Sequence, residues 1–162
     1  LLYSEKLGYF DVPDVYWQTK DYEGIQNPIS ANKIKNGELW EQYDSTIGCR
    51  TIKGSNEPGD YAILDIYEVG KKLVLTWGEQ LSTCVSYMQD ELNCKPLAII
   101  NCLNFGHPKD SMRDFKDTIN KMSAKIGLSV PIPIVGGNVS LYNCTEGISI
   151  RPTPIFVVVG IM

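Results

Sequence analysis

The sequence lacks most of the patterns by which metal and nucleophile sites are recognised, and each absence excludes a class of protein. His107 is its one histidine and no Cys-x-x-Cys pair occurs. Neither a zinc site of the usual spacing nor a His-based triad is therefore indicated. A Walker-type glycine loop is also missing. No apolar run approaches the roughly 20 residues of a membrane-spanning helix, and no signal-peptide pattern opens the chain. We therefore expect no membrane association.

Positive charge is scarce as well. Fifteen lysines and arginines stand against nineteen acidic residues, which gives a formal net charge of -4. Because the basic residues are not clustered, no nucleic-acid partner is expected. The 43% hydrophobic and 21% charged fractions are those of a globular protein. The length of 162 residues suits one domain and an additional segment, and the start at Leu1 predicts a piece of a longer protein.

Disulfides are not expected either. The five cysteines are odd in number and not closely paired, which argues against a disulfide framework; they are Cys49, Cys84, Cys94, Cys102 and Cys144. Reduced and mostly buried thiols are typical of a cytoplasmic protein. We therefore expect the protein in the cytoplasm.

The chain divides into two parts by composition. Residues 1–58 are rich in Tyr, Trp, Asn, Gly and Pro and have little periodicity, which predicts a linker or wrapping segment. A short helix is expected from Ser30 to Trp40, with Ser30 as its N-cap. Residues 59–162 have regular patterns and are predicted to form the domain.

Within this second part, the patterns predict alternating strands and helices. Residues 61–66 and 73–77 are expected as strands joined by a turn. Residues 81–92 are expected as a helix, since apolar residues recur every three or four positions. Residues 97–100 are entirely apolar, which predicts a strand buried on both faces.

A second helix and two strands are expected after the turn at Gly106–Pro108. The helix is predicted from Ser111 to Ile126, with Ser111 and Asp114 as a capping box and Gly127 at its end. Strands are predicted over 132–143 and 155–161. The fold class is therefore α/β (α+β), a mixed β-sheet with two helices on one face. The other face is available for pairing with a like domain, because so apolar a sheet should not remain exposed to water.

Gly136–Asn143, with the sequence GGNVSLYN, is the strongest candidate for a binding site. Glycine allows close approach of a ligand to the backbone, and the Asn, Ser and Tyr side chains are neutral donors and acceptors. This combination suits a polyanion or a metal-bound phosphate. The alternative is a strand with a bulge and no ligand.

Asn101–Gly106 is a second candidate, because ligands gather at the carboxyl ends of parallel strands. The alternative is an ordinary turn. If this segment and residues 132–143 lie on adjacent strands, their polar side chains share one edge of the sheet. His107 and Cys102 are weak catalytic candidates, since no base or orienting carboxylate is evident beyond Asp110.

Two acidic residues are further candidates. Asp60 and Asp65 are interpreted either as metal or nucleotide contacts or as part of a strand rim.

Three strings together resemble one enzyme family: Pro96–Pro108, Gly137–Asn143 and Pro152–Pro154. They are similar to phosphoribosylformylglycinamidine synthase subunit II, which belongs to the aminoimidazole-ribonucleotide-synthetase-like ATP enzymes. The similarity extends from about Ile25 to the end and corresponds to the N-terminal subdomain of the second repeat. It implies a purine-biosynthesis ligase that uses ATP and Mg to convert formylglycinamide ribonucleotide and ammonia to the amidine.

The resemblance also implies roles for individual residues. Asn101 and Gly137 match positions that contact ATP, Asn138 matches a magnesium ligand, and Ser140 matches a contact to the substrate. At the position of Asn101 the family normally has Asp, and at the position of His107 it normally has Asn. An Asp-x-Asn stretch and an Asp-Pro loop that normally follow Thr76 are missing here. The family's catalytic histidines lie in the first repeat, so we expect the isolated chain to be inactive.

The resemblance further implies partners. They are the first repeat of the same enzyme or a like domain, a glutaminase subunit that supplies ammonia, and a small accessory subunit. As a fragment, the chain is expected to form a homo-oligomer. The alternative function is a non-catalytic dimerisation or interaction domain whose nucleotide site has degenerated.

Overall fold

The computed structural model describes residues 47–54, 57–124 and 131–162. Six strands form one sheet in the order β1-β2-β3-β8-β4-β5, and β6 and β7 form a separate small hairpin. The strands are β1 (Thr51–Lys53), β2 (Tyr61–Ile66), β3 (Lys71–Gly78), β4 (Lys95–Asn104), β5 (Ile134–Ser140), β6 (Cys144–Thr145), β7 (Ile148–Ser149) and β8 (Thr153–Ile161). The helical segments are η2 (Ile47–Cys49), α2 (Leu81–Ser86), η3 (Tyr87–Glu91) and α3 (Pro108–Ser123).

The sheet is mixed, as predicted. β4 and β5 pair in parallel, whereas the other neighbours in the sheet pair antiparallel. A parallel pair needs a crossover, and α3 supplies it between β4 and β5. The predicted order of strands and helices is therefore confirmed, with β1 and the β6–β7 hairpin added to it.

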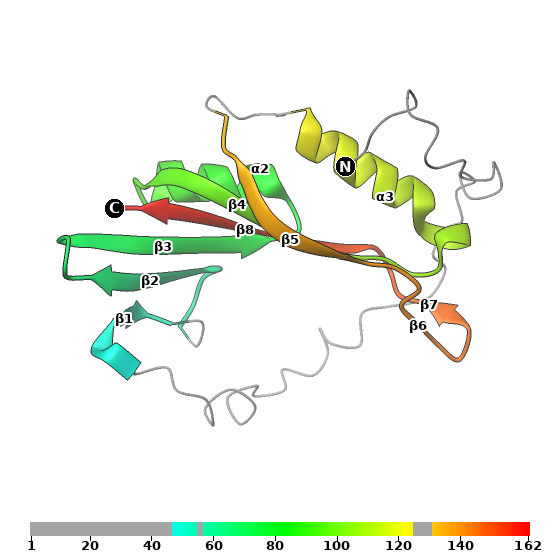
Figure 1. Cartoon of the computed structure of the whole chain (residues 1–162), viewed down its shortest axis with the longest axis horizontal. Coiled ribbons are helices and arrows are strands. Elements are labelled where there is room, and N and C mark those ends of the chain that lie inside the picture. The colour runs from blue at the N-terminus through cyan, green and yellow to red at the C-terminus, as the bar shows by residue number, and fades with distance from the viewer. Residues whose placement is uncertain (1–46, 55–56, 125–130) are drawn as a thin grey trace.

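Both helices cover the same face of the sheet (Figure 1). Val85 and Met88, from α2 and η3, belong to a core cluster with Val74, Ile99 and Val158 of the strands. A second cluster joins Leu103, Phe105 and Phe156, and its partly buried neighbours from α3 are Phe115, Ile119 and Met122. The predicted arrangement of two helices on one face is confirmed. We call the opposite side of the sheet the open face.

The prediction that residues 97–100 are buried on both faces is wrong. Ile99 is 1% exposed, whereas Leu97 and Ile100 are 41% and 39% exposed. Side chains alternate along a strand, so Ile100 points away from the face that the helices cover, while Leu97 lies at the register irregularity between Pro96 and Ala98. The apolar run therefore marks a strand with two apolar faces, of which only one is covered in this chain.

The start of α3 also differs from the prediction. The helix begins at Pro108, and its N-cap is His107, whose Nδ1 accepts a hydrogen bond from the Lys109 N–H at 3.1 Å. Proline is well suited to the first helical position, since it lacks the N–H that would be unpaired there. Ser111 is fully buried in the first turn, where its hydroxyl donates to the carbonyl oxygens of Gly106 and His107. Ser111 and Asp114 are therefore not the capping box.

Three other expectations have different outcomes. The expected burial of the cysteines holds for Cys84 and Cys94 only; Cys102 is half-buried, and Cys49 and Cys144 are exposed free thiols. The predicted helix at Ser30–Trp40 and the predicted helix end at Gly127 lie outside the described residues. β1, which falls inside residues 1–58, pairs with β2, while the division of the chain at residue 58 stays a prediction.

Candidate functional site

The two candidate segments lie side by side at the carboxyl ends of β4 and β5. In the parallel register, Asn101 is opposite Gly137, Cys102 is opposite Asn138, and Asn104 is opposite Ser140. Parallel pairing places both carboxyl ends at the same edge of the sheet, which is where α/β proteins collect ligands. The expected adjacency of the two segments is therefore observed.

Alternation along the strands separates these residues into two groups. Asn101 is opposite Phe156, whose side chain belongs to the helix-covered core, so Asn101 and Gly137 are on the helix-covered side. Cys102 and Asn104 of β4 share the open face with Asn138 and Ser140 of β5. The open face thus holds the predicted magnesium and substrate residues together, with a thiol and a second amide beside them.

Gly137 fits closely against Asn101. A Cβ at Gly137 would lie 2.2 Å from the Asn101 carbonyl oxygen and 2.5 Å from its Oδ1, and the residue has φ +154°. No side chain larger than hydrogen fits there. The protein's own β4–β5 packing therefore already requires glycine at this position.

The hydroxyl of Ser140 is held by hydrogen bonds to Asn143. The Asn143 amide Nδ2 donates to the Ser140 hydroxyl at 2.9 Å and to the Phe105 carbonyl at 2.9 Å. The Ser140 hydroxyl donates in return to Asn143 Oδ1 at 3.1 Å. Two backbone bonds join the same segments, from Phe105 N–H to Ser140 and from Asn143 N–H to Phe105. Asn143 therefore fixes the hydroxyl of Ser140 at the end of β5.

Among the described residues of this edge, Asn138 has a polar side chain without a hydrogen-bond partner. It is exposed, and its amide makes no hydrogen bond within the described residues, although its backbone carbonyl accepts from Asn101 Nδ2 at 3.4 Å. A neutral amide oxygen that faces solvent is available to a hard cation. By contrast, Asn104 Nδ2 already contacts the carbonyls of Cys102 and Thr153.

Two further candidates lie in structural positions, the catalytic candidate His107 and the metal or nucleotide candidate Asp65. His107 caps α3 and packs edge-on against Tyr142, with ring centroids 5.0 Å apart. Asp65 lies inside β2, opposite Lys72. No group of three or more His, Cys, Asp or Glu side chains in the described part of the chain is placed to hold a metal ion. The described helices also include none that is long and apolar enough to cross a bilayer.

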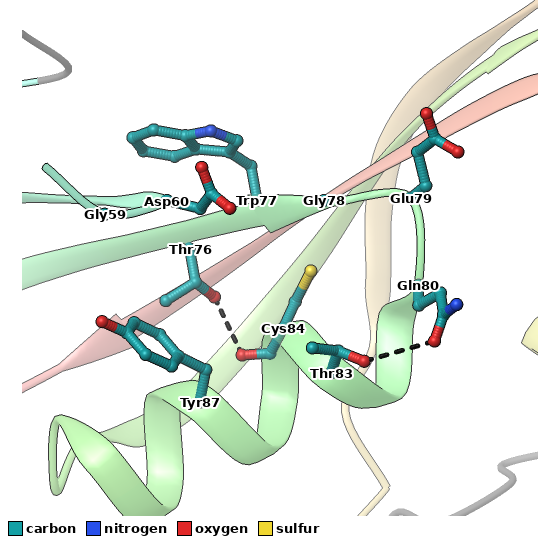
Figure 2. Close-up of a pocket in the computed structure, with 10 residues that line it drawn as sticks. All are labelled: Gly59, Asp60, Thr76, Trp77, Gly78, Glu79, Gln80, Thr83, Cys84 and Tyr87. Atoms are coloured by element: carbon teal, nitrogen blue, oxygen red, sulfur yellow. Dashed lines mark hydrogen bonds between the residues drawn. The ribbon is translucent and has the colours of Figure 1, made fainter.

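A cavity of about 500 Å³ lies at the carboxyl end of β3, which is separated from β4 by β8 in the sheet. Its lining comes from the two residues before β2, the end of β3, the turn after it and the helix that follows (Figure 2). The lining residues are Gly59, Asp60, Thr76, Trp77, Gly78, Glu79, Gln80, Thr83, Cys84 and Tyr87. Only Glu79 and Gln80 separate β3 from α2. The cavity therefore lies at this short connection between strand and helix.

Figure 2 shows that the residues of this cavity lie on both sides of β3. The Trp77 ring and the Asp60 carboxylate lie on one side of β3, and Thr76, Cys84 and Tyr87 lie on the other, between β3 and the helix. Thr76 is buried and donates to the Cys84 carbonyl at 3.0 Å. Burial raises the pKa of the Cys84 thiol, so this cysteine is not poised as a nucleophile.

Arg151 connects this cavity to the β4–β5 edge. Its guanidinium donates twice to the carboxylate of Glu79. Its carbonyl accepts from Thr153 Oγ1, and the Thr153 carbonyl accepts from Asn104 Nδ2. Arg151, Glu79 and Trp77 were not predicted as site residues from the sequence. Two features could have indicated them: an aromatic residue at the end of a strand, and a cation directly before Pro152.

Comparison with known proteins places this fold in one family. Residues 49–162 match the family model described as AIR synthase related protein, N-terminal domain. Phosphoribosylformylglycinamidine synthase subunit PurL of Pelagibacter ubique (strain HTCC1062) is 32% identical over 164 residues, which cover 90% of this chain and 22% of that protein. The chain thus spans about a fifth of the length of such relatives.

Solved structures agree with this assignment. The structure of PurLQS from Thermotoga maritima aligns with a TM-score of 0.58 and 26% identity over 78% of this chain and 24% of the matched chain. T. maritima PurL complexed with ADP aligns with a TM-score of 0.54 and 25% identity over 77% of this chain and 23% of that one. The chain therefore belongs to the AIR synthase related protein family, with its residues 49–162 forming the family's N-terminal domain.

Proposed function

We propose that this chain is part of an ATP-dependent synthetase that converts formylglycinamide ribonucleotide and ammonia, derived from glutamine, to formylglycinamidine ribonucleotide in the cytoplasm. Its family membership, the names of its relatives and the ADP complex of a similar structure support this proposal. The observation that carries it is the pairing of β4 with β5, which places the free amide of Asn138 and the fastened hydroxyl of Ser140 on one face.

The residues divide the work by chemistry. Asn138 offers one neutral oxygen to Mg²⁺, and Ser140 offers a hydroxyl to the phosphate of the substrate. Asn101 and Gly137, which are paired on the helix-covered side of the same edge, contribute contacts to ATP. When bound, Mg²⁺ would neutralise charge on the phosphoryl group during its transfer.

The donor set fits Mg²⁺ only together with a nucleotide. Mg²⁺ is usually held by one or two carboxylates plus phosphate oxygens and water. The β4–β5 edge supplies amides and a hydroxyl, and none of the described strand-end residues there is a carboxylate. The phosphates of ATP, or carboxylates of another part of the enzyme, would therefore complete the coordination.

The isolated chain is proposed to be inactive, with the first repeat supplying the rest of the active site. In the full enzyme, a glutaminase subunit and a small accessory subunit are the proposed partners. An assay for ATP- and ammonia-dependent product with the purified chain is expected to give none. Measurable turnover would show that the chain holds a complete active site.

The open face favours a second candidate function, a non-catalytic interaction domain. Ile100 is 39% exposed and is opposite Val157, which is opposite Trp77, so a half-buried apolar row crosses the open face. A row of this kind is suited to pairing with a like domain. Pairing alone would need no nucleotide.

Thermal unfolding in the presence of nucleotide separates the two functions, because a ligand that binds the native state stabilises it by mass action. MgATP is expected to raise the melting temperature of the wild-type chain, and Asn138→Ala is expected to reduce this rise. Asn120→Ala, which removes an exposed amide from α3, is the matched control and should leave it unchanged. No rise in the wild type would favour the interaction domain.

A further inference from the structure

We propose that Arg151 binds a phosphate group at the rim of the open face, and that it exchanges the carboxylate of Glu79 for this phosphate. Neither residue is among those to which the family resemblance assigns a role. The inference rests on the proposed function in one respect, since it takes the phosphate to be that of the ribonucleotide substrate or the one that the reaction releases.

Polar side chains form a row along this rim, where two strands end and a third begins. Asn104 of β4 is opposite both Ser140 of β5 and Thr153 of β8. Residues that are opposite each other share a face of the sheet, so all three side chains belong to the open face. We call Ser140, Asn104 and Thr153 the rim row.

Arg151 lies beside the rim row. Its carbonyl accepts a hydrogen bond from Thr153 Oγ1 at 3.0 Å, and its guanidinium donates to Glu79, which directly follows β3. Figure 2 shows the Glu79 carboxylate on the same side of β3 as the ring of Trp77, a residue of the open face. The guanidinium is therefore at the rim of the open face.

The carboxylate of Glu79 engages Arg151 as a phosphate would. Two guanidinium nitrogens donate to the two carboxylate oxygens, which is the bidentate geometry with which arginine also binds phosphate. The two side chains are 42% and 44% exposed, and exposed ion pairs are weak. A phosphate monoester carries about −1.5 to −2 charges at pH 7, against −1 for the carboxylate, so it can displace Glu79.

Asn104 provides a second donor, which the protein holds only weakly. Its Nδ2 is 3.4 Å from the carbonyl oxygens of Cys102 and Thr153. These distances exceed the usual range of about 2.7–3.2 Å for N–H···O bonds. A phosphate oxygen near Asn104 can therefore compete for this amide.

Arg151 also provides the permanent positive charge of this rim. Segments 101–107, 138–143 and 150–153 contain no other lysine or arginine. Hydrogen bonds from a charged donor are roughly twice as strong as those from the neutral groups of Asn104 and Ser140. Arg151 is thus the residue that would select a ligand with a phosphate over one without.

The order of the strands allows the exchange. β8 lies between β3 and β4, and neighbouring strands are about 4.8 Å apart. Arg151, which precedes β8, is therefore about as near to the end of β4 as to the end of β3. Rotation of its side chain away from Glu79 brings the guanidinium toward Asn104, while Ser140 can donate to the same phosphate from β5.

An NMR titration with ribose 5-phosphate at low ionic strength, without Mg²⁺ and ATP, tests the inference. The backbone amide resonances of Asn104 and Thr153 are expected to shift saturably in the wild type. Arg151→Gln is expected to bind at least about tenfold more weakly, because charge-assisted hydrogen bonds are lost. Arg113→Gln removes the same charge from the exposed side of α3 and is the matched control, which should not change the affinity.

Glu79→Gln distinguishes the exchange from a simple loss of structure. We expect it to bind about two- to fivefold more tightly, since it removes the competing partner of an exposed ion pair, and a folding defect cannot raise affinity. Inorganic phosphate in the same titration separates the two sources of the group. Tighter binding of ribose 5-phosphate indicates the substrate and tighter binding of inorganic phosphate indicates the released product, and either result supports Arg151 as the phosphate ligand.

The contrary outcomes separate this inference from the proposed function. If ribose 5-phosphate and inorganic phosphate cause no saturable shift, or Arg151→Gln binds them as well as the wild type, the phosphate site at Arg151 is wrong, whether or not MgATP binds through Asn138. An unchanged affinity in Glu79→Gln would overturn the exchange. If phosphate binds through Arg151 but MgATP does not bind, the inference stands and the proposed nucleotide site is wrong.

Discussion

At the scale of single residues, the two adjacent glycines of β5 have different reasons to be glycine. A Cβ at Gly137 would collide with the backbone of Asn101, whereas a Cβ at Gly136 would meet nothing within 4 Å. The sequence motif predicts that this stretch needs glycine, but it cannot distinguish a ligand from a neighbouring strand as the reason. Only the β4–β5 register reveals that the close neighbour is the protein itself.

Gly137→Ala is therefore expected to destabilise the fold by about 1–3 kcal/mol, the usual cost of overpacking, with additional strain from the positive φ. The measurement is urea unfolding followed by circular dichroism. Gly136→Ala is the matched control and should lie within about 0.5 kcal/mol of the wild type. Equal effects of the two substitutions would contradict the close fit between Gly137 and Asn101.

Asn138 and Asn143 show the limit of prediction at this scale. Both belong to the predicted polar stretch, and nothing in the sequence distinguishes them by environment. In the structure, Asn143 bonds to Phe105 and Ser140, and Asn138 bonds to nothing through its side chain within the described residues. Hydrogen bonds between segments 38 residues apart cannot be read from local spacing.

At the scale of elements, the Asn143 bonds attach the turn after β5 to the end of β4. Asn143→Ala leaves the carbonyl of Phe105 and the groups of Ser140 with fewer partners, which costs about 1–3 kcal/mol. We expect a lower free energy of unfolding and faster amide exchange at Tyr142 and Asn143. Asn138→Ala should leave both unchanged, and a comparable loss of stability in that variant would contradict the assigned roles.

Whether a segment is a helix or a strand could be predicted where the periodicity is strong. What surrounds each helix or strand could not be predicted. The strand at 61–66 and the strand at 73–77, inside β3, follow from their apolar patterns. The predicted start of α3 was wrong because a histidine is the N-cap in place of the more common Ser or Asp. The prediction that residues 97–100 are buried on both faces was wrong, because an apolar run indicates that both faces of a strand are apolar but does not indicate what covers each face.

At the scale of the whole molecule, the sheet has one covered face and one open face (Figure 1). The sequence predicted this asymmetry from the count of two helices, and the core clusters confirm it. We propose that a like domain covers the open face. The 162-residue chain is expected to self-associate through this face.

Ile100→Lys is expected to weaken self-association, because it places a charge in the centre of the open face without touching the helix-covered core. Light scattering after size-exclusion chromatography measures the change as a lower molar mass. Val69→Lys is the matched control, since Val69 is an exposed apolar residue in the β2–β3 turn. A wild-type chain that stays monomeric at high concentration would contradict pairing through the open face.

We propose that this chain contributes part of a magnesium–nucleotide site at the carboxyl edge of its sheet. Isothermal titration of the chain with ATP tests it most directly, once with Mg²⁺ and once with the metal chelated. We expect one saturable site per chain that requires both ATP and Mg²⁺, no detectable binding of Mg²⁺ alone, and at least about tenfold weaker binding by Asn138→Ala, which corresponds to about 1.4 kcal/mol. An absence of binding in the wild type, or binding that neither chelation nor Asn138→Ala alters, would contradict it.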